Sequence, residues 1–300
     1  MSFSRLKDTI EEGDTVILHL NPFNLHSIVV KPEIANKHDE FVENVFQTKY
    51  GALRIKTLIG RKFGSKISLS KGWAYVLHPT PELWTVTLPH RTQIIYNADI
   101  SLIIFQLDLK PGSIVIESGT GSGSLTHALA RSVSPDGTVH TFDFHKQRTD
   151  LAEAEFAAHG IGNVVKSFHQ DVCQHGFGPE LDSTADAVFL DLPHPWLVVL
   201  HAVKALKKTG GRFCSFSPCI EQVQRTCQEL HEHGFKEIAT MECLQRELAV
   251  RSRTISTLDS GKENESDLDK FTFNSALPAA VVPGHTGYLT FATLSPCLND

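Results

Sequence analysis

The sequence predicts an α/β protein: a parallel sheet with helices on both faces, preceded by a small β domain. Two observations predict this fold class. From Asp99 onward, short apolar runs alternate with helical segments, which is the pattern of repeated βα units. Before His78, short β-like runs are separated by Gly, Pro and polar turns. We therefore expect residues 1–78 to form a small β-barrel-like domain and residues 79–300 to form the larger α/β domain.

The small domain is assigned from five β-like runs: TVILHL, SIVV, ALRIKTLIG, KISL and WAYVLH. The charged segment 32–50 interrupts them without a clear period. We expect that segment to be a loop or an appended helix.

The larger domain is assigned in chain order. The predicted strands are SIVIE, TVHTFDF, VVKSFHQDV, ADAVFLDL and GRFCSFS, and GYLTFATL is a last strand that can close the sheet. The predicted helices are DISLIIFQLDL, LTHALARSV, KQRTDLAEAEFAAHG with its end at Gly160, PWLVVLHAVKAL and IEQVQRTCQELHEHG. The segment 252–283 is rich in Ser, Asp and Glu, so we expect an insertion near 256–283 that is partly disordered.

Composition limits the classes of function. The formal net charge is -6, whereas a chain that bound nucleic acid alone through a large phosphate footprint would usually be basic. No run approaches the roughly 18 apolar residues of a membrane span, and the first residues lack the features of a secretory signal. We expect a soluble intracellular protein without a membrane partner. The cysteines and histidines are scattered without a ligand pattern, so no metal site is expected.

The stretch IESGTGSGSL, residues 116–125, joins a predicted strand to a predicted helix. Its glycines are Gly119, Gly121 and Gly123, whereas the dinucleotide fingerprint needs its third glycine one residue later, where this chain has Ser124. Such a loop lets ligand atoms approach bare backbone and the amide dipoles at the start of a helix. A tight strand-to-helix turn without a ligand is the alternative.

Acidic residues at consecutive strand ends favour the ligand. Asp143 closes the second strand, where a carboxylate can accept hydrogen bonds from both hydroxyls of a ribose. Asp171 closes the third strand, where it can accept from an adenine amino group. Glu117, before the glycines, would repel a pyrophosphate but suits a cationic amino-acid tail. These strand ends predict an adenosine site.

With Glu117 and its glycines, the chain resembles the class I methyltransferases, whose first motif is ExGxGxG. The chain more closely resembles the catalytic chains of the eukaryotic tRNA (adenine-N1) methyltransferases, which modify an adenine in the T-loop. This narrower resemblance rests on the phrases FLDLPHPW, HPTPELW, PHRTQIIY, RFCSFSPCIEQVQ and GHTGYLTFA. The resemblance spans almost the whole chain except 31–50 and 252–283. It implies a Rossmann-like class I methyltransferase domain with a small N-terminal β domain, and S-adenosyl-L-methionine as cofactor.

The same resemblance implies partners and a location. They are a tRNA substrate, a noncatalytic homologous subunit in a heterotetramer of two catalytic and two noncatalytic chains, and the nucleus. Messenger RNA with a similar loop is left open as a further substrate.

In the resembled family, the phrase that contains Asp191 lies beside the methyl donor and the target base, so Asp191 is the expected catalytic residue. A carboxylate at the adenine N6 amino group accepts its hydrogen and stabilises the positive charge that develops on the base. A plain helix cap near Pro195 is the alternative for Asp191. The family often has Glu where this chain has Asp143, so the ribose contact is expected with altered geometry. The expected cofactor-binding residues are Ile95, Glu117, Ser118, Gly119, Gly121, Ser122, Gly123, Ser124, Leu125, Asp143, Arg148, Asp171, Val172 and Asp191.

Adenine N1 lies on the Watson–Crick edge, so the base must leave its pairing and enter a pocket. Tyr96 and Trp196 are candidates for the wall of that pocket, and either could instead be ordinary core. The segment 215–222 after the fifth strand is expected to contact RNA, or else to be a simple turn. The expected RNA-contacting residues are Gln93, Tyr96, Trp196, Ser215, Ser217, Pro218, Gln222 and His285, of which Gln93 and His285 rest on the resemblance alone.

Two functions of other classes remain open at this point. One is a noncatalytic RNA-binding subunit, which would lack intact cofactor motifs. The other is a class I methyltransferase that acts on protein or small molecules, which the phrase DLPHPW disfavours.

Overall fold

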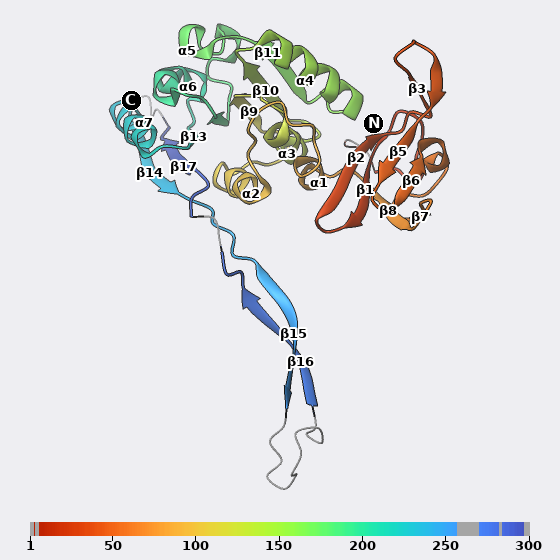
Figure 1. The fold of residues 1–300 in the computed structure, drawn as a ribbon. Helices are drawn as coiled ribbons and strands as arrows, with labels where there is room; N and C mark the ends of the chain where they lie inside the picture. Colours follow the sequence, from red (N-terminus) through yellow and green to blue (C-terminus); the bar gives the residue numbers. More distant parts are fainter. Residues whose placement is uncertain (1–2, 4–5, 257–269, 282–283, 297–300) are drawn as a thin grey trace. The chain divides into compact units, whose positions relative to one another are not determined.

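The computed structural model describes residue 3 and residues 6–256, 270–281 and 284–296. It divides into two compact units (Figure 1). The first unit comprises Met1–Met241 and Gly287–Asp300, and the second comprises Glu242–Thr286. The small β domain and the α/β domain both lie within the first unit.

The small β domain is built on a four-stranded antiparallel sheet in the order β2-β1-β8-β7. Its strands are β1 (Thr15–Asn21), β2 (Asn24–Val29), β7 (Lys66–Ser68) and β8 (Trp73–Leu77). Alternate residues of β8 follow the two-residue period of a strand: Ala74 and Val76 are fully buried, whereas Trp73 and Tyr75 are largely exposed.

Two segments of this domain differ from the prediction. The charged segment, expected as a loop or helix, forms β3 (Glu33–Ala35), β4 (Phe41–Glu43) and β5 (Val45–Thr48). The run expected as one strand splits into β6 (Gly51–Arg54) and the 3-10 helix η1 (Ile55–Leu58). Ile55 and Leu58 are both fully buried, because a three-residue turn brings residues three apart onto one side.

The α/β domain contains a seven-stranded sheet in the order β11-β10-β9-β12-β13-β17-β14. Its strands are β9 (Ile114–Ser118), β10 (Thr138–Asp143), β11 (Val165–His169), β12 (Ala187–Leu190), β13 (Gly211–Ser217), β14 (Phe235–Met241) and β17 (Tyr288–Leu294). The first five pair in parallel and β17 is antiparallel to both of its neighbours. The last strand lies between β13 and β14, and β14 is a strand that the sequence analysis did not assign.

Helices separate these strands along the chain. They are α1 (Pro81–Thr85), α2 (Asn97–Gln106), α3 (Ser124–Val133), α4 (Lys146–His159), α5 (Val172–His175), η2 (Pro179–Leu181), η3 (Pro195–Val198), α6 (Val199–Ala205) and α7 (Ile220–Glu232). The predicted end of α4 at Gly160 is confirmed, since that glycine has a φ of 79° and its N–H caps the helix. The single helix predicted after Asp191 is divided into η3 and α6.

The core lies on both faces of the large sheet. On β12, Val188 packs in one hydrophobic cluster and Phe189 in the other, because successive side chains of a strand point to opposite faces. On β9, Val115 and Ile116 are divided in the same way. Because both faces of the sheet are covered, a ligand-binding site is expected at the carboxyl ends of the strands.

The second unit is a two-stranded antiparallel hairpin of β15 (Leu248–Ser256) and β16 (Lys270–Pro278). The strand β16 differs from the expectation of disorder near 256–283, because Phe271 and Phe273 pair across the hairpin with Ile255 and Arg253. The rest of that expectation, at 257–269 and 282–283, lies outside the described residues. No helix in the described ranges is both long enough and apolar enough to span a membrane.

Candidate active site

The acidic residues predicted at the strand ends meet at one edge of the sheet. In β9, Glu117 pairs with Thr141 of β10 on one side and with Phe189 of β12 on the other. Asp143 and Asp191 each follow those partners by two residues. Because the strands are parallel, all three carboxyl groups lie at the carboxyl edge of the sheet.

A cavity of about 540 Å³ opens at this edge. This size falls in the usual range for sites that bind small molecules and cofactors. The predicted cofactor residues in its wall are Ile95, Glu117, Ser118, Gly119, Gly121, Ser122, Ser124, Leu125, Asp143, Arg148, Asp171, Val172 and Asp191. Gly123 is the one member of the predicted set that is outside the lining.

The glycine loop is close to the segment that carries Asp191. Gly119 has a φ of 103°, and a Cβ atom there would lie 2.4 Å from the backbone oxygen of Asp191. Gly121 has a φ of 53°, and its Cβ would lie 2.7 Å from Oγ1 of Thr92. Gly119 therefore requires glycine for backbone conformation and for space, whereas at Gly121 the nearest atom is a side-chain oxygen and the φ is one that other residues also adopt.

Asp143 is 4% exposed and already accepts several hydrogen bonds. The N–H of Gly121 donates to its Oδ2 at 3.1 Å, and the N–H of His145 donates to its Oδ1 at 2.8 Å. Arg148 forms an ion pair with Oδ1 at 3.0 Å. Asp143 thus joins the glycine loop to the start of α4, and its carboxylate, which lines the cavity, has further acceptor positions.

Glu117 is the most deeply buried acid of the site, at 1% exposure. Burial raises its pKa to about 7, although Thr126 Oγ1 donates a hydrogen bond to its Oε2 at 2.7 Å. Burial also raises the pKa of Asp191 to about 6. Two neighbouring carboxyl groups with raised pKa values form a site that a cationic ligand would stabilise.

Two serines of the predicted set hold the segment 91–95 over the loop. Ser122 Oγ accepts from the backbone N–H of Arg91 at 2.9 Å and of Thr92 at 3.1 Å. Ser124 Oγ donates to the carbonyl of Ile95 at 3.0 Å. Their hydroxyl groups are therefore engaged in shaping the cavity wall.

Asp171 has a local role as well. Its Oδ1 accepts from the N–H of Cys173 at 3.0 Å, so it caps the short helix α5. Because a carboxylate has further acceptor positions, the cap leaves room for a contact with an adenine amino group.

The residues predicted to contact RNA are spread over different environments. Gln93 lines the cavity, whereas Tyr96 is 47% exposed at the start of α2, outside the lining. Trp196 packs against His194, with ring centroids 5.0 Å apart, and Arg225 lies over its ring at 5.1 Å.

Ser215 and Ser217 differ from the expectation of RNA contact. Both are fully buried in β13, and their hydroxyl groups have no hydrogen-bond partner within the described ranges. Both serines lie on the same face of β13 as Phe213, which belongs to a hydrophobic core cluster, so this face is covered. Of the residues after the strand, Pro218 is exposed.

Gln222 links α7 to the segment of Asp191, because its Nε2 donates to the carbonyl of Pro193 at 2.9 Å. It is thus placed to support the cavity wall. His285 belongs to the second unit, where its Nδ1 lies 2.5 Å from Oε1 of Glu242.

Several cavity residues were not singled out from the sequence. Phe144 and Leu197 are 62% and 51% exposed and line the cavity, as do Thr92 and His194. For Phe144, the one signal in the sequence was an aromatic residue directly after the strand-end Asp143. The others reach the cavity only through the tertiary fold.

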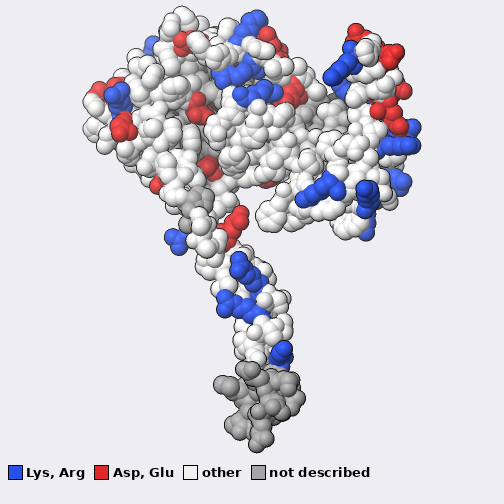
Figure 2. All heavy atoms as spheres, viewed as in Figure 1, with Lys and Arg blue, Asp and Glu red and all other residues white. Residues whose placement is uncertain are grey.

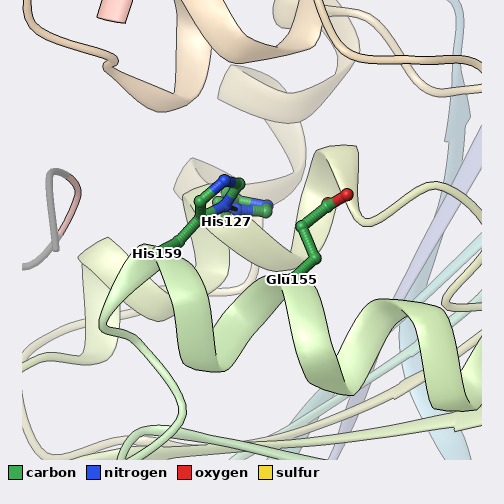
Figure 3. Close-up of side chains that lie close together, drawn as sticks. All are labelled: His127, Glu155 and His159. Atoms are coloured by element: carbon green, nitrogen blue, oxygen red, sulfur yellow. Dashed lines mark hydrogen bonds between the residues drawn. The ribbon is translucent and has the colours of Figure 1, made fainter. Parts of the chain in front are cut away.

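One group in the described part of the chain has the composition of a metal site: His127, Glu155 and His159 (Figure 3). Glu155 Oε2 is paired with Arg91 at 3.0 Å, and the two imidazoles are hydrogen-bonded to each other. This group is in contact with the glycine loop, because the His127 ring is hydrogen-bonded to the Gly123 carbonyl.

Solved structures share this fold. An S-adenosylmethionine-dependent O-methyltransferase from Thermotoga maritima matches with a TM-score of 0.76 and 28% identity, over 99% of this chain and 98% of that chain. A tRNA (m1A58) methyltransferase from Aquifex aeolicus matches with a TM-score of 0.70 and 23% identity, over 95% and 98%, and supports the fold alone. The Rossmann-like methyltransferase fold is confirmed.

Curated relatives extend the comparison. A protein of Dictyostelium discoideum is 39% identical over 96% of this chain and 97% of its own length. One of Cryptococcus neoformans is 47% identical over 79% of this chain, which spans only 53% of that relative. Both are named tRNA (adenine(58)-N(1))-methyltransferase catalytic subunit. The family model described as "tRNA methyltransferase complex GCD14 subunit" matches residues 72–277, and the chain belongs to this family.

Proposed function

We propose that this chain is the catalytic subunit of a tRNA (adenine-N1) methyltransferase that transfers a methyl group from S-adenosylmethionine to the T-loop adenine. The observation that carries the proposal is one cavity that contains both the buried acid of the glycine loop, Glu117, and the acid of the DLPHPW segment, Asp191. The names of the curated relatives support the substrate and the methylated atom.

The cavity fits the methyl donor by charge and by shape. The amino-acid end of the donor carries an ammonium group, which would compensate the buried carboxyl of Glu117. Because Gly119 has no Cβ, the glycine loop can lie within contact distance of the Asp191 backbone. Asp143 would accept from the ribose hydroxyls and Asp171 from the adenine amino group.

The donor supplies a methyl group on a sulfonium, which is displaced in line by adenine N1. The protein therefore has to hold the base and to stabilise charge, without a covalent intermediate. Asp191 accepts a hydrogen bond from the N6 amino group of the target base and stabilises the positive charge that develops on the base. With a pKa of about 6, this carboxyl is mostly ionised at pH 7 to 8. The exposed side chains of His194 and Leu197 lie beside it in the cavity wall and offer a surface for the flipped base.

A homologous partner chain is part of the proposal, supported by the description of the family as a complex subunit. The net charge of -6 is poorly suited to grip a tRNA alone. The hairpin β15–β16 also exposes apolar side chains, with Val250 at 72% and Phe271 at 57%. A two-stranded hairpin is marginally stable by itself, so this exposed surface suits a protein interface.

Basic residues accompany those apolar side chains. Figure 2 shows Lys and Arg side chains along the hairpin, and its exposed Arg251, Arg253 and Lys270 would add positive surface to an assembly. The arrangement of two catalytic and two noncatalytic chains, and the nuclear location, stay predictions.

The experiment is methyl transfer from donor labelled in the methyl group to tRNA, with and without the candidate partner. We expect label in tRNA only with the partner, and none when the T-loop adenine is replaced by guanine. Asp191→Asn should lower transfer at least about 10²-fold, whereas the exposed control Asp136→Asn should not change it. Label in protein or small molecules but not in tRNA would support the alternative methyltransferase class. Binding of tRNA without donor binding would indicate a noncatalytic subunit.

A further inference from the structure

Two buried histidines that the proposed mechanism does not use, His127 and His159, lie next to one another (Figure 3). His127 is in the first turn of α3 and His159 is the last residue of α4. They are 2% and 4% exposed. Their rings are joined by a hydrogen bond of 2.8 Å between Nε2 of His127 and Nδ1 of His159. The other ring nitrogen of His127, Nδ1, lies 2.6 Å from the carbonyl oxygen of Gly123.

The positions of the protons follow from these partners. A carbonyl oxygen only accepts, so His127 must carry its proton on Nδ1 and donate it to Gly123. Burial lowers the pKa of His127 to about 4 and that of His159 to about 3, so both rings are neutral at pH 7. His127 Nε2 is then an acceptor, and His159 must donate from Nδ1. The Gly123 carbonyl thus fixes the tautomer of His127, and His159 stabilises that tautomer by donating to the unprotonated Nε2.

The imidazole is the main donor to the Gly123 carbonyl. The backbone N–H of His127 also reaches this oxygen, but at 3.3 Å against 2.6 Å for the ring nitrogen. Gly123 is the N-cap of α3 with a φ of 75°, so the first helical hydrogen bond is long. Removal of the imidazole would leave that carbonyl with a single weak partner.

The orientation of the Gly123 carbonyl matters for the cavity. In a planar trans peptide, the N–H of the next residue points opposite to the carbonyl. A Gly123 carbonyl held toward α3 therefore directs the N–H of Ser124 away from the helix, beyond its N-terminus. Ser124 and Leu125 line the cavity at that end. These amides and the positive end of the helix dipole are suited to the carboxylate of the donor's amino-acid moiety.

The surroundings favour a hydrogen-bonded pair over a metal site. Both ring nitrogens of His127 are engaged by Gly123 and His159. The nearby Glu155 is paired with the guanidinium of Arg91, whose charge opposes a bound cation. The ring of Phe3 packs on His127 and His159, with centroids 4.9 Å and 4.4 Å away, which shields the pair from water.

We propose that His127 is a positioning residue for the methyl donor, which acts through the Gly123 carbonyl, and that His159 stabilises the tautomer that this contact requires. This inference rests on the proposed function, because the loop it positions belongs to the donor site.

The direct test is nitrogen NMR of the protein labelled with 15N-histidine at pH 7. We expect a neutral His127 with its proton on Nδ1, which is the less common tautomer of a free histidine side chain. His159→Leu removes the donor to Nε2 and should shift the 15N resonance of that unprotonated nitrogen, whereas His159→Asn, which keeps a donor at the position of Nδ1, should leave it near its wild-type value. This readout needs no activity, so it separates the inference from the proposed function.

Binding of S-adenosylhomocysteine gives the functional test. His127→Leu should weaken its affinity by about 10-fold, since a buried carbonyl loses its main donor. His127→Asn places an amide nitrogen where Nδ1 lies and should stay within about 3-fold of wild type. With the partner present, His127→Leu should raise KM for the donor and leave KM for tRNA unchanged.

Three results would overturn the inference. The first is an Nε2–H or doubly protonated His127 in the wild-type NMR spectrum at pH 7, which stands even if a variant does not fold. The second is wild-type affinity in His127→Leu. The third is one equivalent of metal in the purified protein whose removal by a chelator abolishes binding, because the ring nitrogens would then be ligands. If wild type binds neither the donor nor S-adenosylhomocysteine, the proposed function is wrong. The NMR result would still test the hydrogen-bonded pair of His127 and His159.

Discussion

Replacement of Glu117 by Gln should stabilise the ligand-free protein and weaken its binding to the methyl donor. The pKa of Glu117 rises from 4.5 to about 7 because the side chain is buried. At about 1.4 kcal/mol per pKa unit, ionisation of this group at pH 8 destabilises the folded chain by about 3 kcal/mol. Gln keeps an oxygen for the Thr126 hydroxyl but carries no charge.

The sign of the pH dependence follows from the same shift. Between pH 4.5 and about 7 the folded state holds a proton on Glu117 that the unfolded state has released. Wild-type stability therefore falls as pH rises through this window, and the Glu117→Gln variant lacks this contribution. Its ligand-free unfolding midpoint should exceed that of wild type at pH 8 by several degrees and nearly match it at pH 5.

The opposite effect is expected with ligand. Calorimetry at pH 8 should show S-adenosylmethionine binding about 10- to 100-fold more weakly to Glu117→Gln, because a charged hydrogen bond is lost. The exposed control Glu153→Gln should change neither property. If the Glu117→Gln variant were less stable than wild type at pH 8, or bound the donor equally well, this account of the buried acid would be wrong.

Three further predictions follow from the same site and from the hairpin. Asp191→Asn should lower methyl transfer at least about 10²-fold while calorimetry shows retained donor binding; an active variant would contradict its role. Gly119→Ala should abolish binding of S-adenosylhomocysteine, because its Cβ would lie 2.4 Å from the Asp191 carbonyl, whereas Gly112→Ala has a similar φ of 88° and free space, and should bind normally. Val250→Asp in the hairpin should prevent co-purification with the partner, unlike the exposed control Phe23→Asp; equal recovery of both would exclude the hairpin as the interface.

The fold and the site could be predicted from the sequence where local patterns determine the structure. The strand, glycine loop and helix around Glu117 were predictable because an apolar run, three glycines and a helical segment follow one another directly. Asp143 was assigned by the rule that parallel strands end at one edge, whereas Asp191 was assigned by the family resemblance of its phrase, and both line the same cavity.

Other features depend on contacts that no local pattern encodes. The pair of His127 and His159 is 32 residues apart in the chain, and each histidine alone resembles an ordinary helix residue. The edge strand β14 lacks a clear alternation in burial, so its period was not visible in the sequence. Ser215 and Ser217 were predicted to lie near RNA because they end the fifth strand at the active edge, although the two-residue period of β13 puts both on a covered face.

The central claim, methyl transfer to adenine N1 in the cavity of Glu117 and Asp191, is tested most directly by mapping the product. The chain and its partner would be incubated with tRNA and methyl-labelled donor, and the modified nucleoside would be located by mass spectrometry of RNA fragments. We predict 1-methyladenosine at the T-loop adenine, absent with Asp191→Asn. Label on another atom or another nucleotide, or equal product from Asp191→Asn, would contradict the account.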